Sequence, residues 1–438
     1  MSWGTVKGAE GPDPTGCFVP IMTARLTQTV RKPDDVATLA DTGSFSVTQN
    51  PPHGSTTSMI NTDRLTERFI RFAQTDSPSR NEKAMADMLT EELKALGAEV
   101  SFDDAHTTCG SQTGNLFARF SGTVDAAPML LSGHMDTVVP GEGIKVVLED
   151  GVFRSASETV LGGDDKSALA IVLEVMETLT EKKLPYPPVE IVFTVCEEIG
   201  LLGAKHFDTK KLKADMGYIL DSKDTEAVVT NAPFAVHYTV TVHGVSAHAG
   251  MEPEKGVSAI AVASDAITRI TCGRIDSETT CNIGKIEGGS ATNIVPDRVE
   301  ITGEARSHSK EKLDAIVESI HTAFREAVVH AGGGDDETLP RFEIDVNEDF
   351  PGTSVPHDHA VVALAQEAGK TLGRTIVTQR VGGGSDANVF FGKGITAGVL
   401  GTGMTDVHTV NESITLADMT ACAELLFTIL GHHAKQGA

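Results

Sequence analysis

The sequence predicts an α/β protein whose mostly parallel sheet is interrupted, along the chain, by an inserted ferredoxin-like α+β domain. Strand and helix patterns alternate between residues 59 and 228, which is typical of a parallel sheet flanked by helices. The stretch 229–349 follows the order β-α-β-β-α-β of ferredoxin-like domains. The α/β pattern then resumes over residues 350–438. We therefore expect one α/β domain in two parts, 59–228 and 350–438, with the inserted domain between them.

The first 58 residues differ from the rest of the chain. Residues 1–58 are rich in Gly, Pro, Thr and Ser, a composition that buries little apolar surface, so we expect a disordered or loosely packed extension. Apolar spacing then predicts the first elements of the α/β domain. Helices are predicted over 62–73, 81–96 and 165–180, the last of them amphipathic. Strands are predicted over 99–102, 115–120, 128–133, 188–195 and 217–220.

The pattern changes near residue 229. Phe234, Val236, Tyr238, Val240 and Val242 alternate with other residues, which predicts a strand covered on one face. The remaining elements of the insertion are predicted at 256–270 (helix), 281–286 and 298–305 (strands), 310–331 (helix) and 341–346 (strand). The second part of the α/β domain is predicted to contain a helix over 359–372, a strand over 395–400 and a helix over 416–431.

Composition excludes several classes of partner. The net charge of −25 argues against binding nucleic acid, whose phosphates require Lys and Arg. No run approaches the ~18 apolar residues of a membrane-spanning helix. The six cysteines are scattered without a C-x-x-C pair, and the N-terminus lacks the pattern of a secretory signal. We expect a cytoplasmic protein with reduced thiols.

His134 and Asp136 directly follow the apolar strand predicted over 128–133. A metal-binding imidazole needs an acceptor on its second ring nitrogen, commonly a carboxylate, and this pair supplies both groups. Four further clusters contain acidic residues or His: Gly162-Gly-Asp-Asp-Lys166, Cys196-Glu-Glu198, Asp221 and His408. The carboxyl ends of strands bind ligands in open α/β sheets, so we expect the clusters to meet there.

Such a set suits two divalent cations. A pair of cations about 3.5–4 Å apart needs a bridging carboxylate. Zinc accepts both imidazole nitrogen and carboxylate oxygen. One bridging Asp, two His, one Glu and a second Asp suffice, which leaves one carboxylate of the pair Glu197–Glu198 as a general base. Taken singly, each cluster also has a structural interpretation; Asp164-Asp165, for example, is an ordinary helix N-cap. Their ordered conjunction favours a site.

The motifs resemble the dinuclear-zinc peptidases that include tripeptidase T, carboxypeptidase G2 and aminoacylases. The resemblance covers nearly everything after Met59 and is greatest to the peptidase-T-like branch. It implies that the two α/β parts form a zinc-peptidase-type catalytic domain and that the insertion is a lid or dimerisation domain. Five motifs carry it: Gly162-Gly-Asp-Asp-Lys-Ser167, Cys196-Glu-Glu-Ile-Gly200, Ser246-Ala-His-Ala-Gly250, Gly382-Gly-Gly-Ser-Asp-Ala-Asn388 and His408-Thr-Val-Asn-Glu412.

The resemblance implies a role for each matching residue. His134 and Asp221 ligate one metal ion, Glu198 and His408 ligate the other, and Asp164 bridges them and is followed by a cis peptide bond. Asp136 orients His134, and Glu197 is the general base.

Three more residues have implied roles in the inserted domain. His248 reaches the active site of a neighbouring subunit and polarises the scissile carbonyl, which implies a homodimer through this domain. Asn293 and Arg306 contact the carboxylate of the substrate. Asp386 lies in the glycine-rich loop near the site and receives no role.

The expected activity is hydrolysis of the amide bonds of small peptides by a metal-activated water, as in an aminopeptidase or tripeptidase. Two alternatives use the same metals, namely an N-acyl amino-acid deacylase and a carboxypeptidase. A different class would be a non-catalytic protein that binds metal or peptide. The resemblance implies Zn²⁺, although Co²⁺ or Mn²⁺ can occupy the same ligands.

Overall fold

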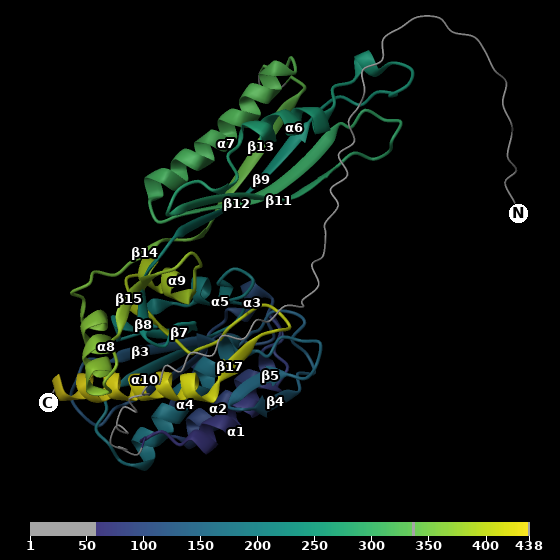
Figure 1. Cartoon of the computed structure of the whole chain (residues 1–438). Helices are drawn as coiled ribbons and strands as arrows, with labels where there is room; N and C mark the ends of the chain where they lie inside the picture. The colour runs from purple at the N-terminus through teal and green to yellow at the C-terminus, as the bar shows by residue number, and fades with distance from the viewer. Residues whose placement is uncertain (1–57, 335–337, 437–438) are drawn as a thin grey trace, which may run out of the picture. The chain divides into compact units, whose positions relative to one another are not determined.

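The computed structural model describes residues 58–334 and 338–436, so the expectation for the N-terminal extension lies outside it. These residues form a nine-stranded, a five-stranded and a three-stranded sheet with helices (Figure 1). No helix among them is both long and apolar enough to span a bilayer.

The nine-stranded sheet is parallel at its centre and antiparallel at its edges. Its strands are β1 (Glu99–Phe102), β2 (Leu116–Phe120), β3 (Met129–His134), β6 (Val189–Thr194), β7 (Met216–Ser222), β8 (Ala227–Ala232), β14 (Thr353–Ser354), β15 (Val377–Arg380) and β16 (Thr396–Gly401). The order is β1-β2-β6-β3-β7-β16-β8-β14, and β15 also pairs with β8. Strands β6, β3, β7 and β16 run parallel. The predicted parallel sheet is therefore confirmed at the centre, and β8, which the sequence did not predict, adds an antiparallel strand.

Helices pack against this sheet. They are α1 (Thr62–Ala73), α2 (Lys83–Ala95), α3 (His106–Cys109), α4 (Gly163–Glu181), α5 (Leu202–His206), α8 (Ala360–Thr371), α9 (Asp386–Gly392) and α10 (Leu416–Gln436). Helix α4 contacts β3 and β7 and is also covered by α1 and α10. The prediction that this helix is amphipathic is wrong, because these neighbours bury almost its whole circumference.

The five-stranded sheet has the order β10-β11-β12-β9-β13 and is antiparallel throughout. Its elements are β9 (Phe234–His243), α6 (Ala259–Arg269), β10 (Gly273–Arg274), β11 (Thr279–Gly288), β12 (Arg298–Ser307), α7 (Lys310–His330) and β13 (Arg341–Phe350). Apart from the short β10, this is the predicted ferredoxin-like order. The expected boundary at residue 229 falls inside β8, which still belongs to the nine-stranded sheet.

A small sheet that the sequence analysis missed consists of β4 (Val146–Glu149), β5 (Val152–Ser155) and β17 (Ser413–Thr415). Asp150 and Gly151 join β4 to β5, both with positive φ (50° and 77°). An Asp-Gly pair is a strong hairpin signal, and it was available in the sequence. The pairing of β17 with β5 matters for the site, because it brings Glu412 back to the start of α4.

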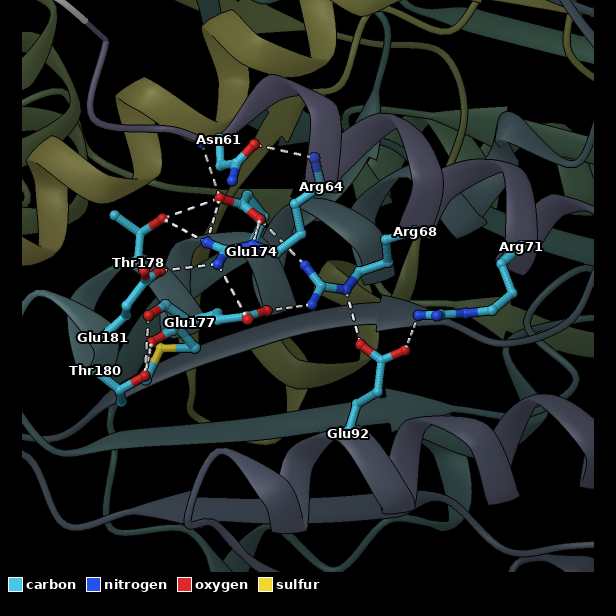
Figure 2. A network of polar contacts seen from close by, with 11 residues as sticks. Asn61, Arg64, Arg68, Arg71, Glu92, Glu174, Glu177, Thr178, Thr180 and Glu181 are labelled. Atoms are coloured by element: carbon cyan, nitrogen blue, oxygen red, sulfur yellow. Dashed lines mark hydrogen bonds and ion pairs between the residues drawn. The ribbon is translucent and has the colours of Figure 1, made fainter.

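A network of ion pairs joins α1, α2 and α4 (Figure 2). The fully buried carboxylate of Glu174 accepts hydrogen bonds from Arg64 Nε at 2.6 Å, Arg68 Nη1 at 3.2 Å and the Asn61 N–H at 3.0 Å. Arg68 also donates to Glu92 of α2 at 2.8 Å. A buried carboxylate is tolerated when its oxygens are paired in this way.

Replacing Glu174 by Ala should destabilise the protein strongly, because two guanidinium groups lose their buried partner. We expect the free energy of unfolding to fall by about 3–5 kcal/mol, measured by urea denaturation. The matched control is Glu181→Ala, which removes a 62% exposed partner of the same Arg64 and should leave stability nearly unchanged. Equal effects of the two substitutions would show that the buried pairing does not hold these helices together.

Candidate active site

Five predicted ligands lie at the carboxyl-terminal edge of the parallel strands. His134 ends β3, Asp221 is the penultimate residue of β7, and Glu198 lies in the turn after β6. Asp164 is in the first turn of α4, and His408 is on the loop between β16 and β17. Because parallel strands end on the same side of a sheet, elements far apart in the chain meet here.

The carboxylate of Asp164 lies between two imidazoles. Its Oδ1 is 3.0 Å from Nε2 of His134, and its Oδ2 is 3.3 Å from Nε2 of His408. Nε2 of His408 is also 2.9 Å from Oε2 of Glu198. Donor atoms of His134, Asp164 and Glu198 all lie within 4.8 Å of one another. One oxygen directed to each imidazole is the arrangement that a bridging carboxylate requires.

Negative charge is crowded in this site. Burial raises the pKa of Glu197 well above its usual value, and repulsion from Asp221 raises it further. Burial and the charge of Asp164 do the same for the pKa of Asp221. Hydrogen bonds with Asp164 and Glu198 raise the pKa of His408 to about 10. The carboxylates oppose one another's ionisation, and together with the two imidazoles they form a donor set that fits divalent cations.

Asp136 holds the turn that carries both glutamates. Its Oδ1 accepts the N–H of Glu197 at 2.9 Å, and its Oδ2 accepts the N–H of Glu198 at 3.2 Å and the hydroxyl of Ser79 at 2.7 Å. Nδ1 of His134 lies 2.9 Å from the backbone oxygen of Asp136 and 3.5 Å from its carboxylate. An N–H at Nδ1 leaves Nε2 available as a ligand atom.

Glu412 is a site residue whose role the sequence analysis missed. Its Oε2 accepts the N–H groups of Leu161 at 2.8 Å and Gly162 at 2.9 Å, and its Oε1 accepts that of Asp164 at 2.9 Å. The side chain therefore fixes the loop that presents Asp164. The peptide bond from Asp164 to Asp165 is cis, as the resemblance implies. The only sequence signal for Glu412 was its place in the motif of His408.

Two predicted residues lie away from this cluster. His248 and Asn293 are exposed neighbours on loops of the insertion, where the N–H of Ala249 donates to the backbone oxygen of Asn293 at 3.0 Å. Within residues 58–334 and 338–436, no hydrogen bond or ion pair joins either side chain to the carboxylate cluster.

Arg306, the third predicted residue of the insertion, lies against the glycine-rich loop. Its Nη1 donates to the backbone oxygen of Gly382 at 3.4 Å, and its Nη2 pairs with Glu304 at 2.9 Å. Asp386, expected in the same loop, is the first residue of α9; it is buried and accepts the hydroxyl of Thr194 at 2.5 Å.

A cavity of about 280 Å³ adjoins the cluster. Asp164, Asp221 and His408 line one part of it, and the remaining lining includes apolar side chains. The apolar lining residues are Val229, Ala232, Val381, Ala387, Ala397, Val399, Met404 and Val407. Its volume is sufficient for a small apolar group next to the charged cluster.

Comparison with known proteins places the chain in a family. Residues 130–432 match the model of the peptidase family M20/M25/M40. The chain is 39% identical over 378 residues to the uncharacterized protein YqjE of Bacillus subtilis (strain 168), a match that covers 86% of this chain and 100% of the relative.

Two solved structures are similar over 86% of this chain and 100% of their own. Aminopeptidase PepT from Bacillus cereus ATCC 10987 is 41% identical, with a TM-score of 0.79. A tripeptidase from Staphylococcus aureus subsp. aureus mu50 is 37% identical, with a TM-score of 0.82. This chain therefore belongs to the peptidase family M20/M25/M40 and fits its peptidase-T-like branch.

Proposed function

We propose that this protein is a metal-dependent aminopeptidase that hydrolyses small peptides, tripeptides in particular. The observation that carries the proposal is the carboxylate of Asp164 between the imidazoles of His134 and His408, beside the buried Glu197. The similarity to an aminopeptidase and a tripeptidase supports the same activity.

The donor set fits two divalent ions. His134, Asp164 and Asp221 would hold one, and Asp164, Glu198 and His408 the other. When bound, the ions supply Lewis-acid chemistry that lowers the pKa of water and polarises a carbonyl. Mixed nitrogen and oxygen ligands favour Zn²⁺, while Co²⁺ and Mn²⁺ accept the same groups.

Glu197 is the proton carrier in this proposal. It takes a proton from the attacking water and returns it to the amine that leaves. Burial raises its pKa, which makes it a stronger base than an exposed glutamate. The hydrogen bond from its own N–H to Asp136 fixes the position of its backbone.

Residues of the insertion complete the site in a homodimer. We assign the insertion, expected over 229–349, to dimerisation. Its exposed His248 then reaches the partner's site and stabilises the negative charge that develops on the scissile carbonyl oxygen. Arg306 and Asn293 bind the terminal carboxylate of the peptide, and the planar guanidinium suits that role. The separation of His248 from the cluster of its own chain supports a role across the dimer.

Metal removal tests the proposed function directly. Chelation should abolish hydrolysis of a tripeptide with a free N-terminus, and added Zn²⁺, Co²⁺ or Mn²⁺ should restore it. Hydrolysis is measured by chromatography of the products. The N-acetylated tripeptide and acetylated amino acids serve as controls, and they should stay intact. If the protein cleaves acetylated amino acids and none of the peptides, the proposed function is wrong and the protein is a deacylase.

Substituting Glu197 by Gln should separate chemistry from metal binding. We expect kcat to fall by about 10²–10⁴-fold, the usual contribution of general acid–base catalysis. Metal content, measured by elemental analysis, should remain that of the wild type, because Glu197 is not a proposed ligand. The exposed Glu149→Gln is the control and should keep full activity. An unaffected kcat in Glu197→Gln would remove Glu197 from the mechanism.

Substituting Glu412 by Gln should weaken metal binding. The carboxylate of Glu412 fixes the loop before Asp164 by accepting three backbone N–H groups, and an amide cannot accept all three. A loss of about 10–100-fold in metal affinity is expected for a group that orients a ligand. Titration of the metal-free protein with Zn²⁺ and a competing indicator measures this affinity. Wild-type affinity in the variant would show that Asp164 is positioned without Glu412.

A further inference from the structure

A second cavity, of about 220 Å³, has a basic lining in a chain of net charge −25. The charged or titratable residues that line it are Arg274, Arg306, Arg380, His308 and Glu278. Three guanidinium groups around one cavity produce a local positive potential that attracts anions.

Two of these guanidinium groups have hydrogen-bonding capacity to spare. Nε of Arg306 is buried and has no acceptor among the residues that the structure describes. Its plane also stacks over the ring of Phe350, 5.8 Å from the centroid, which restrains it. Arg274, exposed on β10, makes no side-chain hydrogen bond or ion pair within the same residues. A planar fork of N–H donors matches the two oxygens of a carboxylate.

The negative charge of Glu278, the acidic residue of the lining, is already paired with cations. Glu278 pairs with Lys312 Nζ at 2.7 Å and with Arg380 Nη1 at 3.1 Å. Burial lowers the pKa of His308, with a further contribution from the charge of Arg380. Arg306 is itself paired with Glu304, so the excess positive charge of the cavity comes from Arg274.

The basic cavity adjoins the proposed site. Val381 lines both cavities, Gly382 lines this one, and the adjacent Gly383 lines the cavity beside the carboxylate cluster. A β-carbon added at Gly382 or Gly383 would meet no atom within 4 Å. The space beside this glycine turn, which separates the two cavities, is therefore open.

We propose that the basic cavity binds a second carboxylate of the substrate, the side chain of a C-terminal Asp or Glu, with Arg274 as its specificity-determining residue. The proposal rests on the function proposed above, in which Arg306 binds the terminal carboxylate. One guanidinium binds one carboxylate bidentately, so Arg274, which has no partner among the described residues, exceeds what a terminal carboxylate bound by Arg306 requires.

The test compares Ala-Ala-Glu with Ala-Ala-Gln, which have the same shape and differ in one charge. For the metal-loaded full-length wild type, kcat/KM should favour the Glu peptide by about tenfold, the size of one charge-assisted hydrogen bond. Arg274→Gln should bring the ratio of the two kcat/KM values close to one. Arg325→Gln, which removes an exposed arginine of α7, is the matched control and should keep the wild-type ratio.

The outcomes separate this proposal from the one on which it rests. A wild-type ratio near one, with both peptides cleaved, overturns the second carboxylate site and leaves the aminopeptidase intact. Failure to cleave either peptide overturns the proposed function. Inorganic phosphate serves as the free-anion probe. A third outcome is that phosphate inhibits cleavage of both peptides equally in the wild type and not in Arg274→Gln, while the wild-type ratio is near one. In that case the cavity binds a free anion and the assignment to the substrate is wrong.

Discussion

The structure depends on one interaction, the carboxylate of Asp164 lying between the imidazoles of His134 and His408. These three residues come from a strand end, a helix start and a loop late in the chain. Burying charged and polar groups together costs free energy unless each is paired. The central parallel strands reduce this free-energy cost because their polar ends lie on one edge of the sheet. The charged groups at that edge pair with one another.

Hydrogen bonds from backbone N–H groups to buried carboxylates position the residues around that interaction. Asp136 accepts those of Glu197 and Glu198, and Glu412 accepts three at the start of α4. The backbone at Cys196 and His408 has positive φ (54° and 63°), a conformation that non-glycine residues rarely adopt and that clusters at functional sites. Local backbone geometry and buried carboxylates thus cooperate to present the donor atoms.

Sequence patterns predicted the long elements well, because apolar periodicity reports directly on a buried face. The helix Thr62–Ala73 and the strand Glu99–Phe102 have the predicted bounds. Short or half-exposed strands were missed, β4, β5 and β17 among them, because a few residues carry too little periodicity. The amphipathic prediction for α4 failed because its polar positions, such as Glu174, are buried against arginines of α1.

The sequence by itself determined the kinds of side chain available, their order along the chain and their resemblance to a peptidase family. Motifs of fixed spacing can be recognised in a sequence without knowledge of the fold. Only the tertiary structure decided that Glu412 holds Asp164, 248 positions away, and that Arg274, Arg306 and Arg380 face one cavity. Contacts between residues so distant leave no periodic trace in the chain. They arise when packing of the sheets brings separate loops together, which is why the candidate ligands and Asp136 could be named from the sequence and the role of Glu412 could not.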